Sequence, residues 1–66
     1  MTIVLNGERR EAPGGVSVLV LLETIGLSPL RVAVEINGRV TRREDFAGAL
    51  LREDDRVEVV QFVGGG

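Results

Sequence analysis

Apolar residues recur at alternate positions in several short stretches of the chain, and this spacing predicts β-strands. The five predicted strands are residues 2–5, 8–12, 31–36, 39–41 and 56–63. Asn6-Gly7 and Asn37-Gly38 lie between paired stretches and favour type I′ hairpin turns, because both residues of such a turn tolerate positive φ. The second strand is mostly charged, which places it at an edge of the sheet.

Residues 18–25 are predicted to form the one main helix. Ser17 suits the N-cap because its hydroxyl can accept a hydrogen bond from the first turn, and Gly26 suits the left-handed position that ends a helix. A wide apolar stripe indicates deep packing over the sheet; it comprises Val18, Leu19, Leu22 and Ile25, widened by Val20 and Leu21. The β-branched run 16–22 also fits a strand, but the cap, the interruption at Glu23 and the glycine stop favour the helix.

The segment between the fourth and the last strand shows little periodicity. Residues 42–48 are polar and irregular, with Phe46 as their one large apolar anchor. Leu50 and Leu51 are both expected to pack under the domain. The acidic residues 53–55 are expected to form a solvated turn into the last strand.

The order of these elements predicts an α+β fold of the β-grasp (ubiquitin-like) class. Such a fold has a mixed sheet, here of four to five strands, with one main helix packed on one face. We expect a single domain over residues 1–63 and a flexible glycine tail over residues 64–66.

The last strand is predicted to carry apolar side chains on both faces. Val57 and Val59 share the face opposite Glu58, and a charged side chain in a sheet covered by one helix should point to solvent. Val60 and Phe62 then lie outside with Glu58, as an apolar patch beside the chain end. The residues predicted to dock a partner are Val60, Phe62 and Val63. There are two alternatives to this docking interpretation. A bulge could shift the register of the strand, or the tail could fold back and cover these residues.

Length and charge exclude several classes of protein. A chain of 66 residues forms one small domain, and it buries only about 60% of its unfolded surface. The net charge of −2, with acidic residues and arginines interspersed, gives no footprint for nucleic acid. We expect no membrane partner and no signal peptide, because apolar runs are short and the amino terminus lacks a basic segment. The absence of cysteine excludes disulfides and thiolate zinc sites and fits a cytoplasmic location.

The residue types that the chain lacks argue against an enzyme. It contains no His, Cys, Tyr, Trp or Lys, which removes most general bases and nucleophiles that work at neutral pH. Its serines and threonines have no histidine to activate them, and no close pair of acidic residues lies in an apolar setting. We therefore expect no catalytic residue, no bound cofactor and no metal site in this chain.

The sequence ends in three glycines directly after the last predicted strand. Because glycine has no Cβ, such a tail can thread a narrow channel in another protein and present its carboxylate for activation. Three extended residues reach roughly 10 Å. The pattern favours a carrier whose reactive group is the carboxylate of Gly66, with Gly64 and Gly65 as the slim approach. A frayed chain end and a cloning remnant are the alternative explanations.

Three stretches of the chain resemble the sulfur carrier proteins of thiamine biosynthesis, the ThiS family. They are residues 32–38 (Val-Ala-Val-Glu-Ile-Asn-Gly), 55–60 (Asp-Arg-Val-Glu-Val-Val) and 62–66 (Phe-Val-Gly-Gly-Gly). The resemblance runs over essentially the whole length, with departures at Thr41, where the family often has proline, and at Asp54, where it often has glycine. The turn at Asp54 should survive because aspartate tolerates a left-handed conformation.

The resemblance implies a definite use of the glycine tail. An ATP-dependent adenylyltransferase related to ubiquitin-activating enzymes is expected to convert the Gly66 carboxylate to an acyl-adenylate. A persulfide sulfur donor is then expected to displace AMP and leave a thiocarboxylate, whose sulfur thiazole synthase takes for the thiazole ring of thiamine. ATP and Mg²⁺ belong to the activating partner.

Other proteins of this fold leave alternatives open. The small subunit of molybdopterin synthase and the carriers of tRNA thiolation share the diglycine ending and the chemistry, and ubiquitin-like modifiers are conjugated to proteins. The short length and residues 34–38 favour the thiamine branch. A different class is a β-grasp binding module that uses its sheet face without covalent chemistry. Residues added after Gly66 would abolish the function of a carrier, whereas a binding module would tolerate them.

Overall fold

Five short strands and three helical segments make up residues 1–62, the part of the chain that the computed structural model describes. In chain order they are β1 (Thr2–Leu5), β2 (Glu8–Glu11), α1 (Val18–Thr24), the 3₁₀ helix η1 (Pro29–Arg31), β3 (Val32–Ile36), β4 (Arg39–Thr41), the 3₁₀ helix η2 (Arg43–Asp45) and β5 (Arg56–Gln61). Val63 and the glycines 64–66 lie outside the described residues.

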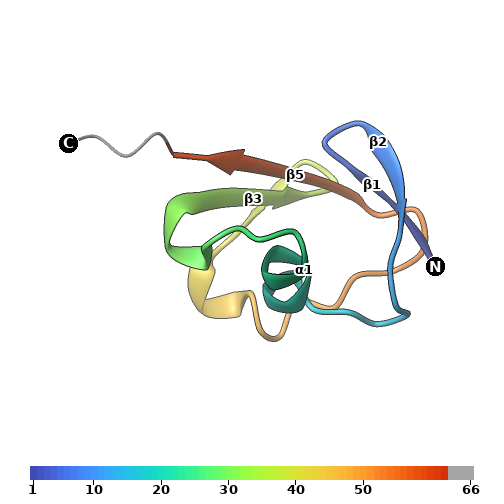
Figure 1. Cartoon of the computed structure of the whole chain (residues 1–66), viewed down its shortest axis with the longest axis horizontal. Coiled ribbons are helices and arrows are strands. Elements are labelled where there is room, and N and C mark those ends of the chain that lie inside the picture. Colours follow the sequence, from blue (N-terminus) through green and yellow to red (C-terminus); the bar gives the residue numbers. More distant parts are fainter. Residues whose placement is uncertain (63–66) are drawn as a thin grey trace.

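The strands form one mixed sheet in the order β2-β1-β5-β3-β4. The central strand β5 runs parallel to β1 and antiparallel to β3, whereas the two hairpins β1–β2 and β3–β4 are antiparallel. Figure 1 shows α1 packed on one face of this sheet. The arrangement confirms the predicted β-grasp architecture, with five strands.

Both predicted hairpin turns have the expected backbone. Asn6 and Gly7 have φ angles of 49° and 82°, and Asn37 and Gly38 have angles of 52° and 82°. Positive φ at both central residues is typical of a type I′ turn, whose twist matches that of the flanking strands. Asp54 also adopts a positive φ, of 66°, so aspartate occupies the left-handed position in the turn before β5 as expected.

Helix α1 begins and ends at the predicted signals. The Ser17 hydroxyl accepts a hydrogen bond from the Val20 amide at 3.1 Å, and Gly26 has a φ of 78° just after the helix. The side chains that the helix buries are Val18, Leu21 and Leu22. Val20 is exposed, so its predicted place in the buried stripe is wrong. Two positions along a helix correspond to a rotation of about 200° around its axis, so their side chains lie on nearly opposite sides. Because Val18 is buried against the core, Val20 faces solvent.

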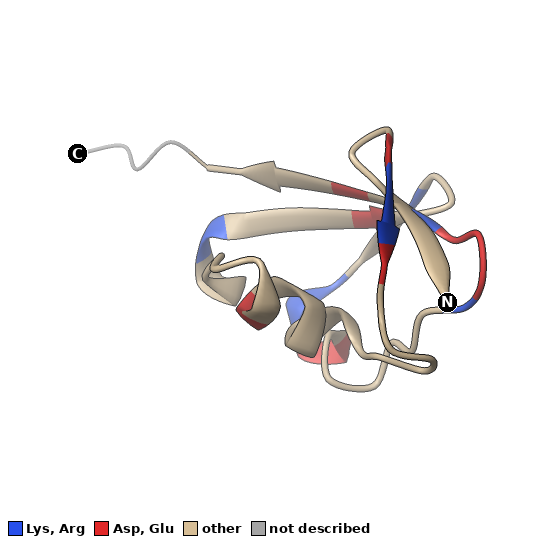
Figure 2. Ribbon diagram, turned by 45° about the vertical axis from the view of Figure 1, so that its right-hand side comes forward, with Lys and Arg blue, Asp and Glu red and all other residues tan. Residues whose placement is uncertain are grey.

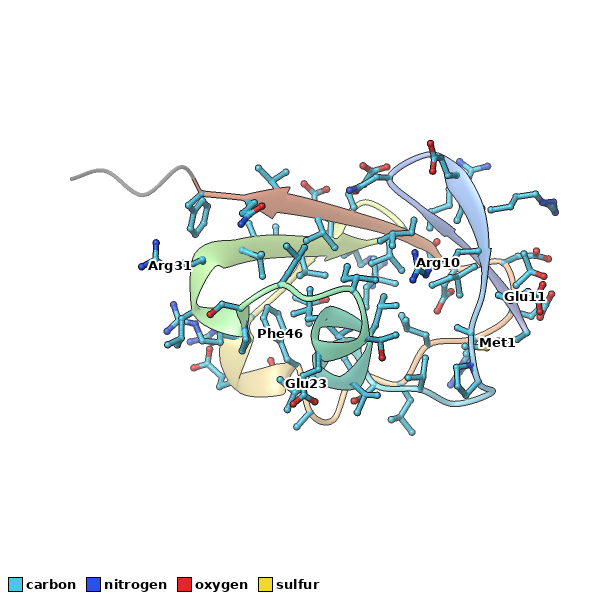
Figure 3. All side chains as sticks on the ribbon, viewed as in Figure 1. Met1, Arg10, Glu11, Glu23, Arg31 and Phe46 are labelled. Atoms are coloured by element: carbon cyan, nitrogen blue, oxygen red, sulfur yellow. The ribbon has the colours of Figure 1, made fainter. Side chains whose placement is uncertain are left out.

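The core lies between α1 and the inner face of the sheet. Figure 3 shows Phe46 beside α1, and its side chain is only 2% exposed, which confirms it as the anchor of its segment. The buried apolar residues are Ile3, Val16, Val18, Leu21, Leu22, Val32, Val34, Phe46, Leu51, Val57 and Val59.

The segment that leads to β5 is more regular than predicted. It contains η2 and then returns alongside the residues before α1, where the Leu51 amide donates to the Val16 carbonyl at 2.8 Å. Leu50 pairs with Ser17 in an isolated antiparallel bridge. Successive side chains of an extended segment point to opposite sides, so Leu51 is 1% exposed and Leu50 is 60% exposed. The prediction that both leucines are buried is therefore wrong for Leu50.

Several element ends differ from the predicted ones by a residue or two. β2 and α1 each end one residue earlier, and β3 begins one residue later because Arg31 belongs to η1. β5 ends at Gln61 rather than at Val63. Phe62 is outside the strand, yet its amide still donates to the Arg31 carbonyl at 2.7 Å.

Candidate functional site

Strand β5 carries the chain toward its glycines and is supported unequally by its two neighbours. β1 pairs with it only at Arg56 and Val57. β3 pairs with it as far as Gln61, and the bond from Phe62 to Arg31 continues this support by one residue. In Figure 3 the Arg31 side chain lies at the end of the domain where β5 ends. The strand is therefore anchored on its β3 side up to the last described residue.

Asn6 extends the support of β5 beyond the end of β1. Its side-chain carbonyl accepts a hydrogen bond from the Val59 amide at 2.7 Å, and its side-chain amide donates to the Val59 carbonyl at 3.2 Å. The two bonds imitate those that a further residue of a neighbouring strand would make. Sequence reasoning assigned Asn6 to the hairpin turn alone and missed this second role.

From Arg56 to Val60 the side chains of β5 alternate between solvent and core as predicted, and Gln61 at the end of the strand is also exposed. Val57 and Val59 are buried, whereas Val60 is 60% exposed and Phe62 is 53% exposed. The pairing with β3 runs without a bulge from Val57 to Gln61, which excludes a register shift as the cause of the exposure. Val60 and Phe62 thus form an exposed apolar patch at the end of β5.

The strand register brings further residues onto the outer face that carries Val60. Ala33 lies opposite Val60, and Glu35 lies opposite both Glu58 on β5 and Val40 on β4. Val40 is 73% exposed, and the sequence analysis missed it. The two-residue turn Asn37-Gly38 fixes the register of β4 against β3. This turn was predicted from the sequence, so the sequence contained the information needed to place Val40 on the outer face. Figure 2 shows acidic residues along the middle of the sheet and an uncharged end of β5.

Residues 1–62 contain no arrangement that suggests a catalytic centre. Within this range, no group of three or more His, Cys, Asp or Glu side chains could hold a metal ion. A surface hollow at the start of β5 is lined by Asn37, Gly38, Arg56 and Glu58, and it lacks a nucleophile. The described part of the chain includes no helix long and apolar enough to cross a bilayer. The hydrogen bonds of β5 to β3 and to the Asn6 side chain instead hold the end of this strand in a fixed position and direction.

The remaining predicted site residues lie outside the described part of the chain. They are Val63, Gly64, Gly65 and Gly66. The roles assigned to them from the sequence stay predictions, as does the docking role of Val60 and Phe62.

A comparison with protein families identifies the chain. The model of the ThiS family matches residues 3–66, which includes both the β-grasp domain and the three glycines. The chain belongs to the ThiS family. This confirms the resemblance to the sulfur carriers of thiamine biosynthesis. The crystal structure of the thiamine biosynthesis protein ThiS from Geobacter metallireducens agrees in fold, with a TM-score of 0.85, 32% sequence identity and full coverage of both chains.

Relatives of this ThiS family chain include both long and short proteins. It is 46% identical over 66 residues to thiazole synthase from Magnetococcus marinus, and 35% identical over 66 residues to thiazole synthase from Paramagnetospirillum magneticum. The chain spans only 20% of the length of each of these two relatives. It is also 30% identical to the uncharacterised protein ycf40 of Porphyra purpurea, of which it covers 93%. Segments like this chain therefore occur within longer thiazole synthases and in proteins of similar length.

Proposed function

We propose that the chain carries sulfur on the carboxylate of Gly66. A carboxylate is a poor electrophile until one of its oxygens becomes part of a good leaving group. In the first step an ATP-dependent adenylyltransferase transfers AMP from ATP to a carboxylate oxygen of Gly66, and pyrophosphate is released. The resulting acyl-adenylate exposes the carbonyl carbon to a sulfur nucleophile.

Sulfur then enters from the persulfide of a donor protein. The terminal sulfur attacks the Gly66 carbonyl carbon, the bond to the AMP oxygen breaks, and an acyl disulfide forms. A second thiol attacks the donor's inner sulfur and forms a disulfide with it, so the outer sulfur stays on Gly66 as a thiocarboxylate. None of these steps needs a cysteine in the carrier, and the chain has none.

The anchoring of β5 is the observation that carries this proposal. β5 is central in the sheet and is bonded to the β3 side as far as Phe62. Four residues follow Phe62 in the sequence, and their chain length limits the Gly66 carboxylate to about 14 Å from that anchor. A short, slim tether on a rigid strand suits delivery of a carboxylate into a partner's channel.

The exposed patch at the end of β5 supports a docking role. Val60 and Phe62 project apolar area into solvent directly before the tether, and exposed apolar patches of this kind mark contact surfaces. We propose that they, together with Val63, contact the adenylyltransferase. Binding there would place the tail at the partner's nucleotide site, where that partner supplies ATP and Mg²⁺.

Thiazole synthase is the proposed acceptor of the sulfur. Two proteins of that name contain a segment 46% and 35% identical to this chain, which favours the thiamine branch over the sister carriers for molybdopterin and tRNA thiolation. The thiocarboxylated chain should lose its sulfur to thiazole synthase and not to molybdopterin synthase. The opposite preference would reassign the acceptor.

ATP–pyrophosphate exchange tests the covalent step. The chain 1–66 should support exchange by its host's adenylyltransferase, because adenylation of Gly66 is reversible. A matched synthetic chain whose Gly66 ends in a carboxamide should support none. Equal exchange by both chains would exclude the Gly66 carboxylate as the acceptor and would favour a non-covalent β-grasp module.

A further inference from the structure

We propose that the edge of β5 at Gln61 pairs with an extended segment of the adenylyltransferase. This inference rests on the proposed function and deepens it by stating how the partner holds the strand. It starts from the direction of the main-chain polar groups of β5. In a strand, the main-chain N–H and C=O groups of successive residues point to opposite edges.

The hydrogen bonds of β5 show which residues face which edge. On the β3 side, the Phe62 amide donates to the Arg31 carbonyl at 2.7 Å, and the Arg56 carbonyl accepts from the Asn37 amide at 2.8 Å. Even-numbered residues of β5 therefore bond toward β3. Odd-numbered residues of the strand bond toward the opposite edge, where β1 lies.

The opposite edge is occupied as far as Val59 and is open at Gln61. The Val57 carbonyl accepts from the Asn6 amide at 2.9 Å, and Val59 is bonded through both its polar groups to the Asn6 side chain. Gln61 comes next, and within residues 1–62 no hydrogen bond joins its main chain to another residue on this edge. Figure 1 shows the reason: β1 and β2 flank one half of β5, and the other half extends past them beside β3.

An open N–H and C=O on one strand edge are complementary to another extended backbone. Asn6 shows that this edge of β5 accepts such a partner, because its side-chain amide makes the same two hydrogen bonds to Val59 that a peptide group of a neighbouring strand would make. Val60 and Phe62 are both exposed beside this edge, so the added segment should carry apolar side chains that can contact them. The occupant is therefore an extended segment with apolar side chains.

The position of this edge identifies the occupant as the activating enzyme. Gln61 is the last residue of β5, and the exposed Val60 and Phe62 flank it in the sequence, directly before the four residues that end at Gly66. A segment bonded there fixes the direction in which β5 ends, and hence the direction of the tail. Such pairing lowers the ordering cost of threading the tail into the partner.

Proline at position 61 removes the proposed donor without breaking the sheet. The Gln61 N–H faces away from β3, and proline is tolerated in strands where its missing N–H faces solvent. Alanine at the same position removes the side chain and keeps the N–H, so the pair Gln61→Pro and Gln61→Ala isolates the main-chain bond. Phe62→Pro serves as the opposite case, because the Phe62 N–H is bonded to Arg31 and its loss should lower the thermal midpoint.

The test is the KM of each carrier variant in adenylyltransferase-catalysed pyrophosphate exchange. The KM of Gln61→Pro should exceed that of Gln61→Ala by roughly tenfold, the effect of losing about one intermolecular hydrogen bond. Equal KM values, with an active wild-type chain, would overturn the edge pairing and leave the proposed function standing. A wild-type chain that supports no exchange would overturn both.

Hydrogen exchange of the wild-type chain gives a second test that does not depend on the folding of a proline variant. The Gln61 amide should exchange rapidly in the free protein and at least tenfold more slowly in the complex with the adenylyltransferase. An unchanged rate at Gln61 in a complex that does form would contradict the pairing.

Discussion

The side-chain amide of Asn6 bonds to both main-chain polar groups of Val59, at 2.7 Å and 3.2 Å, across 53 positions of sequence. Asn6 is also the first central residue of the β1–β2 turn, with a φ of 49°. One residue thus shapes the hairpin and braces the central strand where β1 has ended. The strand that leads to the glycines is held in place by this contact as well as by β3.

Replacement of Asn6 by glycine should destabilise the domain. Glycine keeps the positive φ of the turn, and the variant loses both bonds to Val59. Leaving these partly buried groups without their partner should lower the free energy of unfolding by about 1–2 kcal/mol. Denaturant unfolding measures the change.

Asn37→Gly is the matched control for that substitution. Asn37 has an almost identical φ of 52°, but its side chain bonds to the exposed Arg56 amide and the Asp55 carboxylate, where water can replace it. The Asn37→Gly variant should therefore lose less stability than Asn6→Gly. Equal losses would mean that the bonds to Val59 contribute nothing beyond the turn itself.

The two phenylalanines should respond in opposite ways to truncation. Phe46 is buried, and Phe46→Ala should cost about 3–5 kcal/mol of unfolding free energy, which is enough to unfold much of so small a domain. Phe62 is exposed, so Phe62→Ala should change stability by less than about 0.5 kcal/mol. The same variant should bind the adenylyltransferase more weakly in titration calorimetry. A large drop in the thermal midpoint of Phe62→Ala would place that side chain in the core and remove it from the docking patch.

A bulky residue at position 65 should block activation and leave the fold intact. Gly65→Val adds a branched side chain to the proposed thread, which a channel fitted to glycine excludes. Its rate of pyrophosphate exchange should fall at least a hundredfold, which corresponds to about 2.7 kcal/mol, with an unchanged thermal midpoint. Gly14→Val is the control, because open space surrounds Gly14 and its φ is not in the left-handed region. Normal adenylation of Gly65→Val would contradict the threading argument.

The turn at Asp54 offers a test of backbone strain. Asp54 has a φ of 66°, and its amide donates to the Thr2 carbonyl at 2.7 Å, a bond that any residue except proline keeps. Asp54→Gly should be more stable than Asp54→Ala by about 1 kcal/mol, because alanine carries the steric cost of the left-handed conformation. Thermal unfolding of both variants measures the difference. Equal midpoints would show that the turn adopts another backbone conformation in solution.

Local signals in the sequence predicted most of the fold. The asparagine–glycine pairs gave both hairpins with their turn type, Ser17 and Gly26 gave the ends of the helix, and the alternation around Glu58 gave the exposed positions Val60 and Phe62. Each of these depends on residues close together in the chain. Turn geometry and the period of two therefore sufficed.

Features set by distant residues could not be predicted in this way. Leu50 points outward because of its pairing with Ser17, and Asn6 reaches Val59 across most of the sequence. The exposure of the β5 edge at Gln61 depends on where β1 stops along β5, which no local pattern reports. The apolar character of Leu50 argued for burial, and the tertiary arrangement overrode it.

Intact mass spectrometry of the protein isolated from its host, with its activating enzyme present, tests the central claim most directly. The account predicts a species in which one oxygen is replaced by sulfur, located at Gly66 by fragmentation. It further predicts that this species disappears on incubation with thiazole synthase and its substrates. An unmodified mass under these conditions, with no adenylate formed when ATP and the adenylyltransferase are added, would contradict the sulfur carrier and indicate a non-covalent binding module.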